Sequence, residues 1–217
     1  MNSALVVVDM LYDFIDGSLA CQNADSAVAQ TLKYIDDRLL TMPPVALMQV
    51  KKEMDYMFSL VEENIRLSFK AMVHGAVESN EKITDNEAII DFTNGALTRF
   101  LINLSPSVEQ SDEQVIGSYF HVLNDLERIG DHAENFYEIA AEMSAKKISF
   151  SEKARKDIGA MCDKVTQMLI LAKDAFDNLN RAELPDLAAL ENEVDTMKKE
   201  LTASHFARLA EGDCSMD

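Results

Sequence analysis

The fold is decided by residues 45–77, VALMQVKKEMDYMFSLVEENIRLSFKAMVHGAV, in which apolar side chains recur every three or four residues. Val50, Met54, Met57 and Val61 all follow this spacing. A repeat of that period places the apolar residues on one face of an α-helix. We therefore predict one long amphipathic helix over residues 45–77, with a boundary before it at Pro43-Pro44.

Four further stretches show the same period, over residues 84–104, 111–144, 151–180 and 185–209. Thr84 and Glu87 have the spacing of a capping box at the start of the first of these stretches. The whole chain of 217 residues contains only 7 glycines and 4 prolines, too few for the many turns of a sheet-rich fold. The predicted fold class is all-α, an antiparallel helical bundle.

The predicted helices form an internal repeat at an offset of 104 residues. The matching pairs include Met57/Met161, Val61/Val165, Glu87/Glu191 and Asp91/Asp195. One offset that relates two helix pairs without gaps indicates a duplicated unit of three helices. We predict an N-terminal segment over residues 1–41, a complete repeat over 42–146, and a second repeat over 147–217 that lacks its third helix. Such a repeat leaves apolar surface exposed, so we also expect self-association into a homo-oligomer.

The charge of the chain excludes some classes of partner. Lys and Arg number 20 and Asp and Glu number 38, which gives a net charge of −18. A surface this acidic repels nucleic-acid phosphates and anionic lipid. No apolar run approaches the roughly 20 residues of a membrane span. The three cysteines, Cys21, Cys162 and Cys214, are widely spaced and are typical of reduced thiols, which suggests a cytoplasmic protein.

Three Glu-x-x-x-Asp pairs are the candidate metal ligands: Glu87/Asp91, Glu127/Asp131 and Glu191/Asp195. Residues four apart share a helix face, so each pair presents two carboxylates that repel one another. A hard cation would remove this repulsion and prefers oxygen ligands. In a chain this acidic, however, most pairs at this spacing are solvated surface, so the spacing alone is weak evidence.

The residues around the central pair, Asn124-Asp-Leu-Glu-Arg-Ile-Gly-Asp-His-Ala133, carry a more specific signal. Here the chain resembles the PhoU family, most closely the PhoU-like C-terminal domain of bacterial Na/phosphate cotransporters. The segments 44–53, 191–201 and 208–215 also match that family's pattern. The resemblance covers residues 42–217 and ends before the family's last helix.

The resemblance implies two three-helix repeats and a metal cluster of iron, zinc or magnesium held by the Glu-x-x-x-Asp motifs. Carried over to this chain, Glu127 and Asp131 are the best ligand candidates, with Asp125 and Asn124 beside them. Glu87 and Asp91 match the acidic motif of the first repeat, and Glu191 and Asp195 that of the second. Because the second repeat lacks its third helix, we expect one metal site and not two.

The resemblance also implies function. PhoU-family proteins restrain phosphate uptake and signalling and are not enzymes, so no catalytic residue is expected. The implied partner is a phosphate transporter or its membrane domain, and the implied location is the cytoplasm, at the inner face of the membrane. Gly130, which lies within a predicted helix, is expected to allow close packing against a neighbouring helix.

Residues 4–40 have a different character. Ala4–Cys21 resembles the opening strand and loop of isochorismatase/nicotinamidase-like hydrolases, in which the position of Asp9 belongs to an Asp-Lys-Cys triad. The strands that would carry the lysine and cysteine are missing, so this hydrolase reading is the weaker alternative. A second alternative is a helical scaffold that binds no metal.

Overall fold

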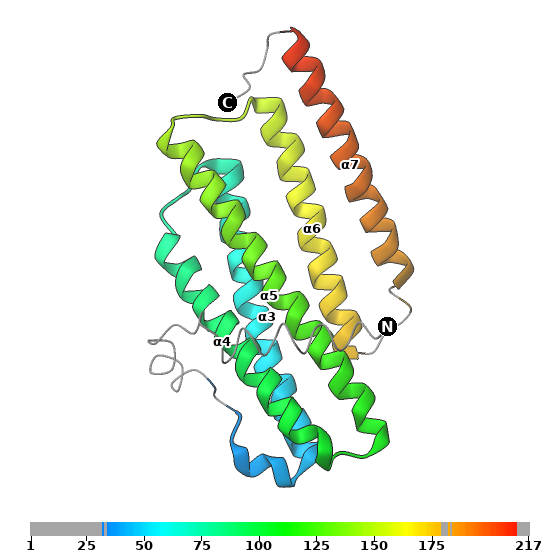
Figure 1. The fold of residues 1–217 in the computed structure, drawn as a ribbon. Helices are drawn as coiled ribbons and strands as arrows, with labels where there is room; N and C mark the ends of the chain where they lie inside the picture. Colours follow the sequence, from blue (N-terminus) through cyan, green and yellow to red (C-terminus); the bar gives the residue numbers. More distant parts are fainter. Residues whose placement is uncertain (1–31, 33, 179–181, 183, 212–217) are drawn as a thin grey trace, which may run out of the picture. The chain divides into compact units, whose positions relative to one another are not determined.

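The computed structural model describes residues 32, 34–178, 182 and 184–211. Within this part of the chain the long elements are the helices α3 (Pro43–His74), α4 (Asn80–Leu104), α5 (Gln110–Ala145), α6 (Glu152–Asn178) and α7 (Leu184–Glu211) (Figure 1). Two short 3₁₀ helices, η1 (Asp37–Thr41) and η2 (Ser105–Ser107), precede α3 and follow α4. The described residues contain no strand, which confirms the all-α fold class. Asp9, Cys21, Cys214 and most of the hydrolase-like segment lie outside the described residues.

Helix α3 begins at the two prolines, which fit the first turn because the N–H groups there need no partner within the helix. It ends at His74 because Gly75 adopts a left-handed φ of 69° and its N–H bonds the carbonyl of Ala71 at 2.7 Å. The predicted end at Val77 was therefore three residues too late. The sequence signal for the true end was the glycine itself.

The predicted start of α4 was wrong. The helix begins at Asn80, one turn before Thr84, so Thr84 and Glu87 lie inside it and form no capping box. The additional turn contains Ile83, which is 1% exposed. Burial of this side chain stabilises the extra turn by about 1.5–3 kcal/mol, more than a typical N-cap contributes.

The remaining helix ends lie close to the predicted positions. Ser151 precedes α6 and its hydroxyl accepts a hydrogen bond from the N–H of Ala154 at 3.2 Å, as an N-cap residue does. Pro185 lies in the first turn of α7, as predicted. Helices α3 and α6 end at His74 and Asn178, and α4 and α7 begin at Asn80 and Leu184, each pair 104 residues apart. The division into sequence repeats stays a prediction.

The chain separates into two compact units, and α3 and α5 each contribute to both. Unit 1 consists of residues 1–61 and 81–132, and unit 2 of residues 62–80 and 133–217. The core of unit 1 is made by apolar side chains of α3, α4 and α5. Its most buried members include Val50, Met54, Met57, Ile90, Leu97, Leu101 and Leu123. This core fixes the faces that α4 and the first part of α5 turn toward each other.

Unit 2 contains the end of α3, the end of α5, and the pair α6 and α7. Helices α6 and α7 lie side by side and run in opposite directions (Figure 1). They are joined by an exposed ion pair between Lys164 and Glu193 at 2.7 Å. No residue of α6 is fully buried, and Ile170 on this helix is 51% exposed. The apolar stripe of α6 is thus only partly covered within the described part of the chain.

None of the described helices is both long enough and apolar enough to cross a membrane.

Candidate metal site on helices α4 and α5

Three carboxylates of unit 1 lie together where α4 faces α5. Glu87 and Asp91 are one turn apart on α4, and Asp131 approaches them from α5. One oxygen from each side chain lies within 4.8 Å of the other two. Glu87 is only 5% exposed, whereas Asp91 and Asp131 are open to solvent. We call Glu87, Asp91 and Asp131 the acidic group.

Gly130 makes room for this arrangement. A Cβ at this position would lie 2.8 Å from Oε2 and 3.0 Å from Oε1 of Glu87. Such distances are too short for a real Cβ contact, so the buried carboxylate of Glu87 takes the space that an alanine would fill. The close packing expected at Gly130 is therefore present. The side chain that packs against this glycine is Glu87, which is itself a candidate metal ligand.

The electrostatics of the group disfavour ionised carboxylates. Desolvation, followed by the repulsion of Asp131, raises the pKa of Asp91 above its ordinary value of 3.8. Glu127 lies one turn before Asp131 on α5, and its pKa is also raised, first by desolvation and then by the charges of Asp131 and Asp91. Arg128 opposes this shift only in part. A cation among these side chains would reverse the repulsion that raises both values.

Three observations indicate that the acidic group could hold a metal ion. All donors are carboxylate oxygens, which suit hard cations such as Mg²⁺. They come from two helices, and one oxygen of each side chain lies within 4.8 Å of the other two. The glycine opposite Glu87 leaves space for the carboxylate itself. Held there, a metal ion would supply positive charge that links α4 to α5.

The other predicted ligands lie elsewhere. Asp125 is exposed on α5 and is not part of the acidic group. Glu127 is half-buried, and the charges of Asp131 and Asp91 raise its pKa. It is nevertheless not one of the three side chains that make up the acidic group. The predicted ligand pair Glu127 and Asp131 therefore stays a prediction, and the three carboxylates that lie closest together combine Asp131 with the pair on α4.

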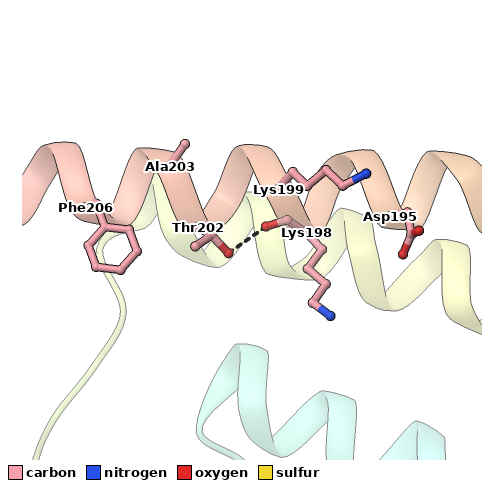
Figure 2. A pocket seen from close by; sticks show the side chains of 6 residues that line it. All are labelled: Asp195, Lys198, Lys199, Thr202, Ala203 and Phe206. Carbon is pink, nitrogen blue, oxygen red and sulfur yellow. Dashed lines mark hydrogen bonds between the residues drawn. The ribbon is translucent and has the colours of Figure 1, made fainter.

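Glu191 and Asp195 are exposed on α7. Asp195 lines a shallow pocket made by α7 alone, together with Lys198, Lys199 and Phe206 (Figure 2). Thr202, on the same face, donates a hydrogen bond to the carbonyl of Lys198 at 2.8 Å (Figure 2). Among the described residues, no third Asp or Glu side chain lies close enough to Glu191 and Asp195 to complete a cation site. Two lysines beside Asp195 already supply positive charge, so this face is less suited to a cation than the acidic group is.

Cys162 is the cysteine that the structure describes, and it lies half-buried in α6. Burial, with the nearby charge of Asp163, raises the pKa of its thiol from 9.0 to about 11. At neutral pH the thiol is therefore protonated and a poor nucleophile. This environment does not favour the hydrolase reading, which would need an activated cysteine.

Comparison with known proteins relates the same region to one family. Residues 54–140 match the family model described as PhoU domain. This range includes all three members of the acidic group. The chain is also 31% identical, over 103 residues, to the phosphate-specific transport system accessory protein PhoU homolog of Synechocystis sp. (strain ATCC 27184 / PCC 6803 / Kazusa).

That alignment covers 46% of this chain and 45% of the cyanobacterial protein, so the chain spans less than half the length of this relative. No solved structure matches the chain. Both matches are to PhoU-family sequences, and the family model covers residues 54–140 alone.

Proposed function

We propose that this chain is a non-catalytic, PhoU-type regulator of phosphate transport whose acidic group binds a metal ion. The observation that carries the proposal is the convergence of Glu87, Asp91 and Asp131 within the region that matches the PhoU domain. The similarity to a phosphate-specific transport system accessory protein supports the regulatory role. The proposed partner is a phosphate transporter, with the membrane domain of a Na/phosphate cotransporter as the specific candidate. The proposed location is the cytoplasm, at the inner face of the membrane.

The metal part of the proposal is tested by the thermal stability of the purified chain. The metal-free protein is prepared with a chelator and then titrated separately with Mg²⁺, Zn²⁺ and Fe²⁺. A ligand at 100 times its Kd stabilises the native state by about 2.7 kcal/mol. For a domain of this size that gain raises Tm by about 5–10 °C.

Variants assign the effect to the site. Asp131→Asn and Glu87→Gln keep the size of each side chain but remove its charge, and both should abolish the metal-dependent rise in Tm. Asp125→Asn, on the exposed part of α5, serves as the matched control and should keep it. A rise of equal size in all the variants would mean that metal binds elsewhere, and no rise in the wild type would favour the metal-free scaffold.

The regulatory part is tested separately, by uptake of labelled phosphate in bacterial cells that express a Na/phosphate cotransporter. Co-expression of the chain should lower the initial rate of uptake, and Asp131→Asn should reduce this effect. Co-purification of the chain with the transporter's membrane domain is the complementary measurement. Unchanged uptake together with no co-purification would contradict the proposed partner without bearing on metal binding.

The hydrolase alternative is tested by turnover of nicotinamide or isochorismate by the full chain. The raised pKa of Cys162 supports the expectation of no turnover. Turnover that is lost in Asp9→Asn would revive this alternative.

A further inference from the structure

A second candidate site lies in unit 2, in a cavity of about 260 Å³. It is formed where three helix ends meet: the last turn of α3, the last turns of α5, and the first turn of α6. None of the residues that line it is acidic, although 38 of the 217 residues in the chain are Asp or Glu. The lining therefore contains no carboxylate that would repel an anion.

Three basic side chains line the cavity: His74 of α3, Lys147 of the loop after α5, and Arg155 of α6. All three are exposed. Among the described residues, neither Lys147 nor Arg155 has a side-chain ion-pair partner. Glu142 pairs with Lys146 at 2.6 Å, and Glu152 pairs with Lys156 at 3.0 Å.

Lys147 lines the cavity in a backbone conformation that is unfavourable for a residue other than glycine. Its φ is 57°, in the left-handed region that favours glycine. The N–H of Lys147 donates a hydrogen bond to the carbonyl of Ser144 at 3.0 Å. The N–H of Ile148 donates one to the carbonyl of Met143 at 2.9 Å. This pair of bonds is a Schellman motif, in which the left-handed position is usually glycine. A lysine here is less favourable for the helix end and supplies an ammonium group to the cavity.

The rest of the lining is mainly apolar. Met72, Met143, Ile148 and Phe150 contribute to the wall, and all are partly buried. The cavity volume is below the roughly 300–1,000 Å³ of sites for drug-sized ligands, so the ligand must be smaller than a typical drug molecule. Basic groups beside an apolar wall suit a small anion that carries an organic substituent.

We propose that this cavity binds a phosphoryl group, as a small phosphate monoester. A phosphate dianion can pair with both a lysine and an arginine, and the guanidinium of Arg155 can donate two parallel hydrogen bonds to it. The positive end of α6 adds to the attraction. The organic part of the ester lies against Met143 and Phe150. The site shares no residue with the acidic group and does not rest on the proposed function.

The test is calorimetric titration of the full chain, with phenyl phosphate and inorganic phosphate as the probes. A chelator is present throughout, so that phosphate cannot bind through a metal ion at the acidic group. The wild type should bind phenyl phosphate saturably, and at least several-fold more tightly than inorganic phosphate. Inorganic phosphate bound as tightly as the ester would overturn the assignment to a monoester. Benzoate bound as tightly as phenyl phosphate would overturn recognition of the phosphoryl group.

Two variants separate a ligand site from a structural role. Lys147→Gly should weaken phenyl phosphate binding at least tenfold while Tm stays the same or rises, because glycine suits the left-handed position. Arg155→Gln should weaken binding to a similar extent. Lys146→Gln, next in sequence but outside the lining, is the matched control and should bind as the wild type does. Absence of saturable binding by the wild type, or affinity unchanged in both cavity variants, would overturn the proposal.

Discussion

Gly130 on α5 lies directly against the buried carboxylate of Glu87 on α4, where a Cβ would be 2.8 Å from Oε2. This contact joins a helix-packing feature to the acidic group, because the space that a side chain would fill is occupied by a candidate ligand. It explains why a glycine is present within a long helix, where it costs about 1 kcal/mol relative to alanine. The same contact gives the sharpest test of the site.

Gly130→Ala should displace the carboxylate of Glu87 and weaken metal binding. The end of a glutamate side chain can move, and alanine favours the helix by about 1 kcal/mol, so we expect Tm without metal to be unchanged or slightly higher. The metal-dependent rise in Tm should shrink markedly. Gly117→Ala is the matched control on α5, because a Cβ there meets no atom within 4 Å, and it should keep the full metal response.

Asp91→Asn should stabilise the metal-free chain at neutral pH. The pKa of Asp91 is raised by desolvation and by Asp131, so the folded state holds this proton more tightly than the unfolded state does. The contribution of this carboxyl to stability therefore falls as pH rises from about the ordinary value of 3.8 through the raised one. Asp91→Asn cannot ionise, so its folding stability does not fall over this pH range.

Urea unfolding of the wild type and Asp91→Asn at several pH values, with chelator, checks this prediction. The stability difference should be absent below that pH window and reach its full size above it. Asp85→Asn, an exposed acid on the same helix that is not part of the acidic group, is the control and should show a smaller difference. A wild type that is more stable than Asp91→Asn at neutral pH without metal would contradict the assignment.

Tyr137→Phe should destabilise unit 2. Tyr137 is 2% exposed, and its hydroxyl donates a hydrogen bond to the carbonyl of Val77, which follows the end of α3. Loss of this bond should lower the free energy of unfolding by about 1 kcal/mol, or somewhat more because the carbonyl loses a partner. Tyr137→Ala, which also empties the core position, should cost about 3–5 kcal/mol. Chemical denaturation measures both, and equal stability of Tyr137→Phe and the wild type would show that water replaces the bond.

Glu53→Ala should release the backbone before η1. Glu53 is fully buried in α3, and its Oε1 accepts a hydrogen bond from the N–H of Tyr34 at 2.7 Å. A hydrogen bond contributes about 0.5–1.5 kcal/mol to stability, so the amide of Tyr34 should exchange with solvent several-fold faster in the variant. Hydrogen-exchange measurement checks this. Lys52→Ala, which removes only the cation 5.6 Å from the Tyr34 ring, should change the rate much less.

Self-association should depend on the exposed apolar residues of α6 and α7. Ile170 and Phe206 are 51% and 64% exposed on these two helices. Large exposed apolar side chains favour association, so we expect a homo-oligomer in sedimentation at micromolar concentration. Ile170→Glu and Phe206→Glu should shift the population toward monomer, whereas Gln167→Glu, at an exposed polar position of α6, should not. A wild type that stays monomeric over this range would contradict the prediction.

The helical class and most helix ends could be predicted from the sequence because their causes are local. The apolar period through Val50, Met54 and Met57 depends on helix geometry alone, and all three side chains are buried in the structure. The start of α4 could not be placed correctly, because a potential cap at Thr84 competes with the burial of Ile83. Only the surrounding core decides which of these two effects is larger.

The sequence by itself determined that this protein is a chain of long amphipathic helices that carry pairs of carboxylates at helical spacing. The tertiary structure decided that Asp131 joins Glu87 and Asp91, because the spacing of residues on one helix does not fix which face of a neighbour it meets. It also decided the cavity at Lys147 and Arg155, where the end of α3 meets the end of α5 and the start of α6, more than 65 residues later in the sequence. Both sites arise from contacts between helices, which local pattern does not encode.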